Sequence, residues 1–178
     1  MRLKLALGLT LALVPSAAFA HTGAGDAHDL IHGFMHPMGG VDHLLAMVAV
    51  GVFAVALGGR ALYAVPAAFV GMMVAGFLLG IAGVQLPFME LVIGASSLVI
   101  AGAALFGRSM KVAAASALVG VFAVFHGVAH GAELPLGASG WEFALGFVVA
   151  TAALHLAGIG ATLAAIRLSG RSATSAKR

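Results

Sequence analysis

Five long apolar runs occupy most of this 178-residue chain and leave few folds open to it. They cover residues 37–59, 61–83, 87–107, 111–132 and 141–168. At about 1.5 Å per helical residue, each run can cross a hydrocarbon core of about 30 Å. Only 8% of the residues are charged, whereas soluble domains carry about a quarter. The runs therefore predict an all-α, polytopic membrane helix bundle with about five transmembrane helices over 37–168.

The N-terminal segment has the features of a secretory signal peptide. Arg2 and Lys4 precede the apolar stretch LALGLTLALV, and the AFA that follows is a small-x-small cleavage site. We expect residues 1–20 to be removed; an uncleaved first helix is the alternative. Residues 21–36 then form a periplasmic, histidine-containing segment, in which an extra short helix stays open.

The basic residues indicate how the five spans are oriented. If the mature N-terminus is outside, the turns at 58–62 and 107–111 and the C-terminal end lie inside. Every Lys and Arg after the signal falls on that side: Arg60, Arg108, Lys111, Arg167, Arg171, Lys177 and Arg178. The positive-inside rule thus predicts a bacterial inner-membrane protein with a periplasmic N-terminus and a basic, disordered cytoplasmic tail at 169–178. These cations form no basic helix face, so we expect no nucleic-acid partner.

Two short motifs place histidine and acidic side chains where lipid is expected. HPMGGVDH at 36–43 opens the first span, and FHGVAHGAE at 125–133 closes the fourth. His126, His130 and Glu133 are spaced by four and then three residues, which puts them on one helix face. An ionisable group within a span costs about 2.5 kcal/mol or more and is rarely left facing lipid. Convergence on one inward-facing site would relieve that cost.

We therefore expect the outer ends of three spans to build a divalent-metal site. Its predicted ligands share a similar depth and are His36, Asp42, His43, Glu90, His126, His130 and Glu133. His32, in the outer segment, and His155, near mid-membrane in the last span, are secondary candidates. The chain has no cysteine, and imidazole and carboxylate donors suit nickel, cobalt, zinc or ferrous iron. Taken singly, these residues also have structural explanations, such as a packing hydrogen bond for His155 or the helix dipole for Asp42.

Glycine pairs indicate tight contacts between helices. The chain has 25 glycines, and GFLLG at 76–80 and GVAHG at 127–131 are G-x-x-x-G pairs, which let helix backbones approach closely. Such pairs are also common by chance in a chain rich in Gly and Ala. We interpret both as candidate helix contacts.

The two polar motifs together resemble the paired signatures of the HupE/UreJ family of membrane proteins, and the likeness covers nearly the whole chain. The resemblance implies secondary or facilitated uptake of nickel, with cobalt as the alternative, to supply nickel enzymes such as hydrogenase or urease. The metal-handling positions it implies are His36, Asp42, His43, His126, His130 and Glu133. The expected partners are then the transported ion and the lipid bilayer, with no prosthetic group. Members of the family are often drawn with six spans, one more than the number predicted here after cleavage.

Three other functions fit parts of the sequence. A haem b electron-transfer subunit would use two helical histidines as axial ligands, but Asp42, Glu90 and Glu133 would then lie expensively beside the porphyrin. An intramembrane metalloenzyme would need H-E-x-x-H, and HGVAH has no glutamate between its histidines. A metal sensor would need a substantial soluble domain, and the apolar runs leave no room for one.

The sequence also indicates how transport would be driven. It lacks the ATP-binding motif G-x-x-x-x-G-K-[ST], so we expect a protein that is not an enzyme. Transport would then be passive or driven by the membrane potential.

Overall fold

The structure is a computed structural model that describes residues 30–107, 109–134 and 139–175. In this part of the chain the backbone forms α-helices and no strand, which confirms the predicted all-α class. The helices are α2 (Leu30–Gly39), α3 (Val41–Leu57), α4 (Ala61–Ile81), α5 (Met89–Phe106), α6 (Val112–Ala132) and α7 (Ser139–Ser175). The predicted signal peptide and the start of the outer segment lie outside the described residues.

Four helices, α4 to α7, are each long and apolar enough to cross a membrane. Their apolar side chains surround the helix axis, as expected where both lipid and neighbouring helices are apolar. Helices α2 and α3 meet the same test only as a pair, and that pair is bent by 90°. By length and composition the described residues thus contain four candidate spans, or five if the bent pair counts as one, in agreement with the predicted number.

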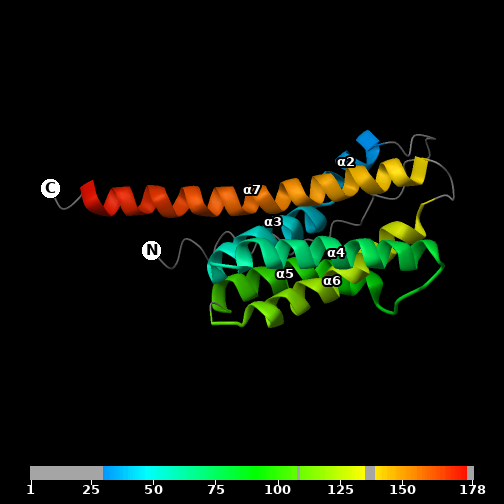
Figure 1. The fold of residues 1–178 in the computed structure, drawn as a ribbon, viewed down its shortest axis with the longest axis horizontal. Coiled ribbons are helices and arrows are strands. Elements are labelled where there is room, and N and C mark those ends of the chain that lie inside the picture. The colour runs from blue at the N-terminus through cyan, green and yellow to red at the C-terminus, as the bar shows by residue number, and fades with distance from the viewer. Residues whose placement is uncertain (1–29, 108, 135–138, 176–178) are drawn as a thin grey trace.

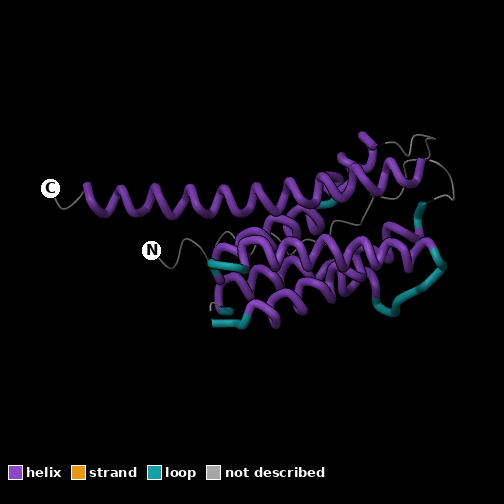
Figure 2. Tube along the Cα trace, viewed as in Figure 1, coloured by secondary structure: helices purple, strands orange, loops and turns teal. Residues whose placement is uncertain are grey.

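The helices form a layered bundle. Helices α4, α5 and α6 lie side by side, α3 lies between this layer and α7, and α2 packs on α7 (Figure 1). Helix α7 runs well past the other helices at its C-terminal end (Figure 1). Apart from the short break between α2 and α3, the connecting loops gather at two opposite ends of the bundle (Figure 2). Helix α6 ends at one of them, with the start of α3 lying deeper in the bundle, and the other end carries the turns that hold Arg60 and Lys111 (Figure 1).

Glycines bring α4 and α6 into backbone contact. A side chain added at Gly76 or Gly80 would collide with backbone atoms of α6, and one added at Gly127 or Gly131 would collide with the backbone of α4. The two G-x-x-x-G pairs therefore pack directly against each other. This contact fixes the last turns of α6, which carry the second histidine motif.

The first apolar run begins at Pro37, and proline is favoured at the first position of a helix, but the expected helix start at Pro37 is wrong. Pro37 is buried inside α2, and the chain bends instead at Gly40, whose extended backbone (φ −113°, ψ 123°) separates α2 from α3. A pair of glycines ends α2, because glycine loses more backbone entropy in a helix than other residues. Packing on α7 supports α2, since Gly33 lies against the backbone of Phe143. The first histidine motif is thus divided between two helices at a right angle.

The expected disorder of the C-terminal tail is also wrong as far as Ser175, where α7 ends. Once a helix has formed, each further residue adds a hydrogen bond at little cost, and no proline interrupts this stretch. The one glycine in it, Gly170, costs about 1 kcal/mol relative to alanine, which is too little to end the helix. Residues 176–178 lie outside the described part.

Candidate metal site

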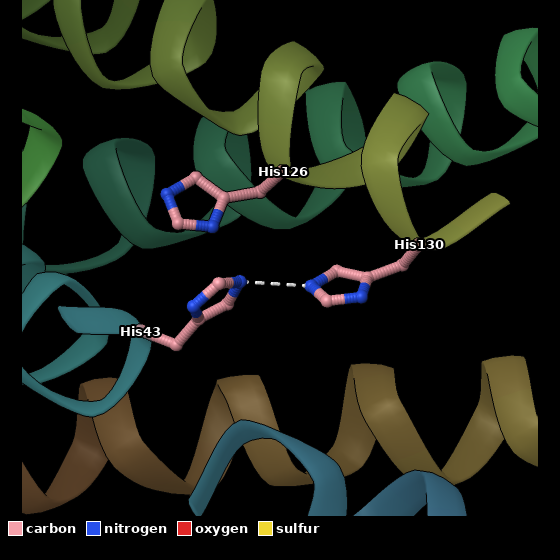
Figure 3. Close-up of side chains that lie close together, drawn as sticks. All are labelled: His43, His126 and His130. Carbon is pink, nitrogen blue, oxygen red and sulfur yellow. Dashed lines mark hydrogen bonds between the residues drawn. The ribbon is translucent and has the colours of Figure 1, made fainter. Parts of the chain in front are cut away.

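Four histidines from three helices meet at one end of the bundle. His126 and His130 are one turn apart in the last part of α6, His43 lies in the first turn of α3, and His36 lies in the last turn of α2. His126 is fully buried and His130 is 3% exposed. Figure 3 shows the rings of His43, His126 and His130 turned toward a common centre. The close contact between α4 and α6 presents this face of α6 to the bundle interior.

The rings are joined by a chain of hydrogen bonds through His130. Its Nε2 lies 2.9 Å from Nε2 of His43, and its Nδ1 lies 3.1 Å from Nε2 of His36. On the far side of His43, Nδ1 lies 3.3 Å from Oδ1 of Asp42. The carboxylate can only accept, so His43 carries its proton on Nδ1 and presents a lone pair at Nε2. The bonds then run in one direction, with His36 donating to His130 and His130 donating to His43.

Within the described part of the chain, two groups of side chains have the spacing needed to hold a metal ion. The inner group is His43, His126 and His130, and the outer group is His36, His130 and Glu133; in each, the ligand atoms lie within 4.8 Å of one another. Two nitrogens bound at about 2.0–2.1 Å and at right angles on one ion are about 3 Å apart. The 2.9 Å between the Nε2 atoms of His43 and His130 already matches that separation.

His130 belongs to both groups and uses a different ring nitrogen in each. Nε2 faces His43 in the inner group, whereas Nδ1 faces His36 and lies 3.9 Å from Oε2 of Glu133 in the outer group. In the inner group His126 and His130 are buried and His43 is partly buried, whereas Glu133 at the outer group is exposed. The arrangement therefore offers two adjacent ion positions, one nearer to solvent and one inside the bundle.

Four predicted site residues lie outside both groups, and one of them, Asp42, instead bonds to Nδ1 of His43. Glu90 is exposed in the first turn of α5, and His32 is exposed on α2, one turn before His36. His155 is buried on α7, edge-on to Phe69 with ring centroids 5.2 Å apart. Neither ring nitrogen of His155 has a hydrogen-bond partner among the described residues. Phe69 also contacts the ring of His126, at 5.9 Å, so it touches both histidines.

Sequence reasoning missed Ser96. This fully buried serine of α5 lies 3.1 Å from Nε2 of His126 through its Oγ. The one signal in the sequence is a hydroxyl in the middle of an apolar run, which many membrane helices carry without a ligand nearby. Only the packing of α5 against α6 shows which histidine it contacts.

Comparison with known proteins gives a consistent result. The family model described as "HupE / UreJ protein" matches residues 9–176. Among curated proteins, "Protein HupE" of Rhizobium leguminosarum bv. viciae is 41% identical over 164 residues, which are 92% of this chain and 84% of that relative. No solved structure matches the chain.

Proposed function

This chain belongs to the HupE/UreJ family, and on that premise we propose that it is a secondary or facilitated permease for a divalent transition metal. The proposed cargo is nickel, with cobalt as the alternative, and the route runs inward across the bacterial inner membrane to supply nickel enzymes such as hydrogenase or urease. The observation that carries the proposal is the inner group, in which His43, His126 and His130 lie at ligand spacing inside an apolar bundle.

The two groups support a stepwise route for the ion. Glu133 and His36 would take a hydrated cation at the mouth, together with Nδ1 of His130. The ion would then pass to Nε2 of His130 and to His43, exchanging water for imidazole one ligand at a time. Binding by three neutral imidazoles adds no negative charge to trap a divalent ion, and passage requires binding that is weak enough to release.

His155 is the proposed next stop. It lies beyond Phe69 from the inner group, and both of its ring nitrogens are without a hydrogen-bond partner among the described residues. A single imidazole would hold the ion loosely on its way to the basic end of the bundle. A membrane potential that is negative inside contributes about 2.3 kcal/mol per charge per 100 mV, twice that for a divalent cation.

The geometry favours this function over haem binding. Axial histidines of a haem lie on opposite faces of the porphyrin, with the iron between them. His43 and His130 instead hydrogen-bond directly at 2.9 Å, and the rings of His43 and His126 are in edge contact, with centroids 4.7 Å apart. No macrocycle fits between these pairs as they stand.

Uptake of labelled nickel at nanomolar concentration tests the proposal, in cells stripped of their own nickel transporters. Cells expressing the wild type should accumulate nickel, and His43→Ala and His130→Ala should abolish the gain while the protein remains in the membrane. His28→Ala, outside both motifs, serves as a histidine control and should retain uptake. Unlabelled cobalt, zinc and iron as competitors rank the metals. Uptake no higher than in empty cells would refute the nickel assignment.

A further inference from the structure

Ser96 makes two hydrogen bonds that together determine where the proton of His126 lies. Its Oγ is 2.6 Å from the carbonyl oxygen of Ile93 in the same helix and 3.1 Å from Nε2 of His126. A serine hydroxyl has one proton to donate and two lone pairs. The carbonyl can only accept, so the hydroxyl proton points to Ile93. The oxygen then offers a lone pair to His126, and Nε2 of the imidazole must be the donor.

The opposite nitrogen of His126 is consequently free to bind an ion. With the proton on Nε2, the lone pair of a neutral imidazole is on Nδ1. Nδ1 is buried and has no hydrogen-bond partner among the described residues. Figure 3 shows this nitrogen, the one next to the ring carbon that bears Cβ, directed toward His43 and His130.

We infer that Ser96 is a positioning residue that holds His126 in the Nε2–H tautomer, so that Nδ1 completes the inner group for a divalent cation. The inference rests on the proposed function. Histidine ligands of metals almost always donate their other N–H to a partner, which fixes both the tautomer and the ring orientation. Ser96 therefore accepts the ring N–H of His126, as Asp42 accepts that of His43, and each partner fixes the tautomer of its histidine.

The two histidines have different partners, a carboxylate for His43 and a hydroxyl for His126, because the two partners differ in exposure to water. Asp42 is in the first turn of α3 with its side chain 43% exposed, where water still solvates a carboxylate. Ser96 is fully buried in a span, where a second carboxylate would be costly. A neutral hydroxyl anchored to Ile93 orients the imidazole and brings no buried charge.

Three variants of the full-length protein, purified in detergent, test this assignment at constant pH. Ser96→Ala removes the acceptor, Ser96→Thr keeps a hydroxyl, and Ser97→Ala removes the adjacent hydroxyl, which makes an exposed hydrogen bond to the carbonyl of Gly94. Ni²⁺ affinity is measured by calorimetry. Loss of such a partner typically lowers metal affinity about 10–100-fold, which we expect for Ser96→Ala alone. Unchanged affinity in Ser96→Ala would overturn the inference.

A second measurement is independent of metal binding. Nitrogen-15 NMR of histidine-labelled, metal-free wild type, with His126 assigned from a His126→Gln variant, reports the tautomer directly. We expect Nε2–H in the wild type and in Ser96→Thr, and a mixture in Ser96→Ala. An Nδ1–H signal in the wild type would overturn the inference. If the wild type bound no nickel or cobalt, the proposed function would fail, whereas the NMR result would still decide the role of Ser96.

Discussion

His126 and His155 are both histidines buried within membrane helices, yet their surroundings differ. They are 0% and 1% exposed, and both touch the ring of Phe69. His126 donates to Ser96 and faces His43 and His130, whereas His155 has no hydrogen-bond partner at either nitrogen among the described residues. Burial alone therefore does not make a metal ligand; convergence of several donors and an oriented lone pair do.

The largest expected effect is a difference in Ni²⁺ affinity between the alanine variants of His126 and His155. His126→Ala should weaken Ni²⁺ binding by about 100-fold or more, since loss of even a partner of a ligand costs about 10–100-fold. His155→Ala should leave equilibrium affinity unchanged while it slows uptake, because on the proposed route His155 binds the ion after the inner group and more weakly. Calorimetry on purified protein measures the affinities, and labelled-nickel uptake in cells measures the rates. Equal losses of affinity in both variants would contradict the comparison.

Substitutions at two glycines test whether close helix contacts hold His126 and His130 in position to bind metal. A side chain at Gly127 would collide with the backbone of α4, and one at Gly158 with the backbone of α3. Each alanine variant should lose about 1–3 kcal/mol of stability from overpacking. Gly127→Ala displaces two ligands of the inner group, His126 and His130, so it should lower nickel affinity about tenfold, as happens in metal sites when ligand orientation is disturbed. Gly158→Ala acts on α3 at Val48 and Gly51, five and eight residues beyond His43, and should lower the affinity less. Thermal unfolding in detergent measures stability and calorimetry measures affinity, and an equal loss of affinity in both variants would contradict this expectation.

The free energy of unfolding should change more at His155 than at His126. His155→Leu removes two buried nitrogens without partners among the described residues and should raise stability by about 1 kcal/mol. His126→Leu removes one such nitrogen, Nδ1, but also the hydrogen bond to Ser96, and these two effects should largely cancel. Thermal unfolding of both variants without metal measures the two changes. A His155→Leu protein that unfolds earlier than the wild type would show that His155 has a structural role.

The smallest expected effect is at Glu90. This carboxylate lies toward the same end of the bundle as His126 but does not face the other candidate ligands. Glu90 is exposed and lies in neither group, so its charge would act only by raising the local concentration of cations. Glu90→Gln should reduce the uptake rate about twofold at low ionic strength, with no change at high salt, because salt screens exposed charges. Calorimetry should show the same Ni²⁺ affinity as in the wild type. A tenfold loss of affinity would instead make Glu90 a ligand.

Local sequence patterns predicted much of this molecule because the bilayer constrains helices strongly. Apolar length indicated the spans, and the spacing of His126 and His130 placed both on one face of α6. The sequence analysis missed the bend at Gly40, because proline at position 37 is a stronger local signal for the start of a helix than a glycine pair is for a break. The contact of α2 with α7 keeps Pro37 inside a helix, and no local sequence pattern predicts that contact.

The sequence by itself determined that the chain is helical, that it has the length and apolarity to span a membrane, and near which end of its helix each polar residue lies. It could not determine how each helix is rotated about its axis. Residues near the same end of the bundle can face each other or face away. His36 and His130, 94 residues apart, meet because α2 is bent by 90° from α3 and packs on α7. Tertiary packing therefore decided that His43 and His126 share a centre, that Ser96 supports it, and that Glu90 and His32 lie outside it.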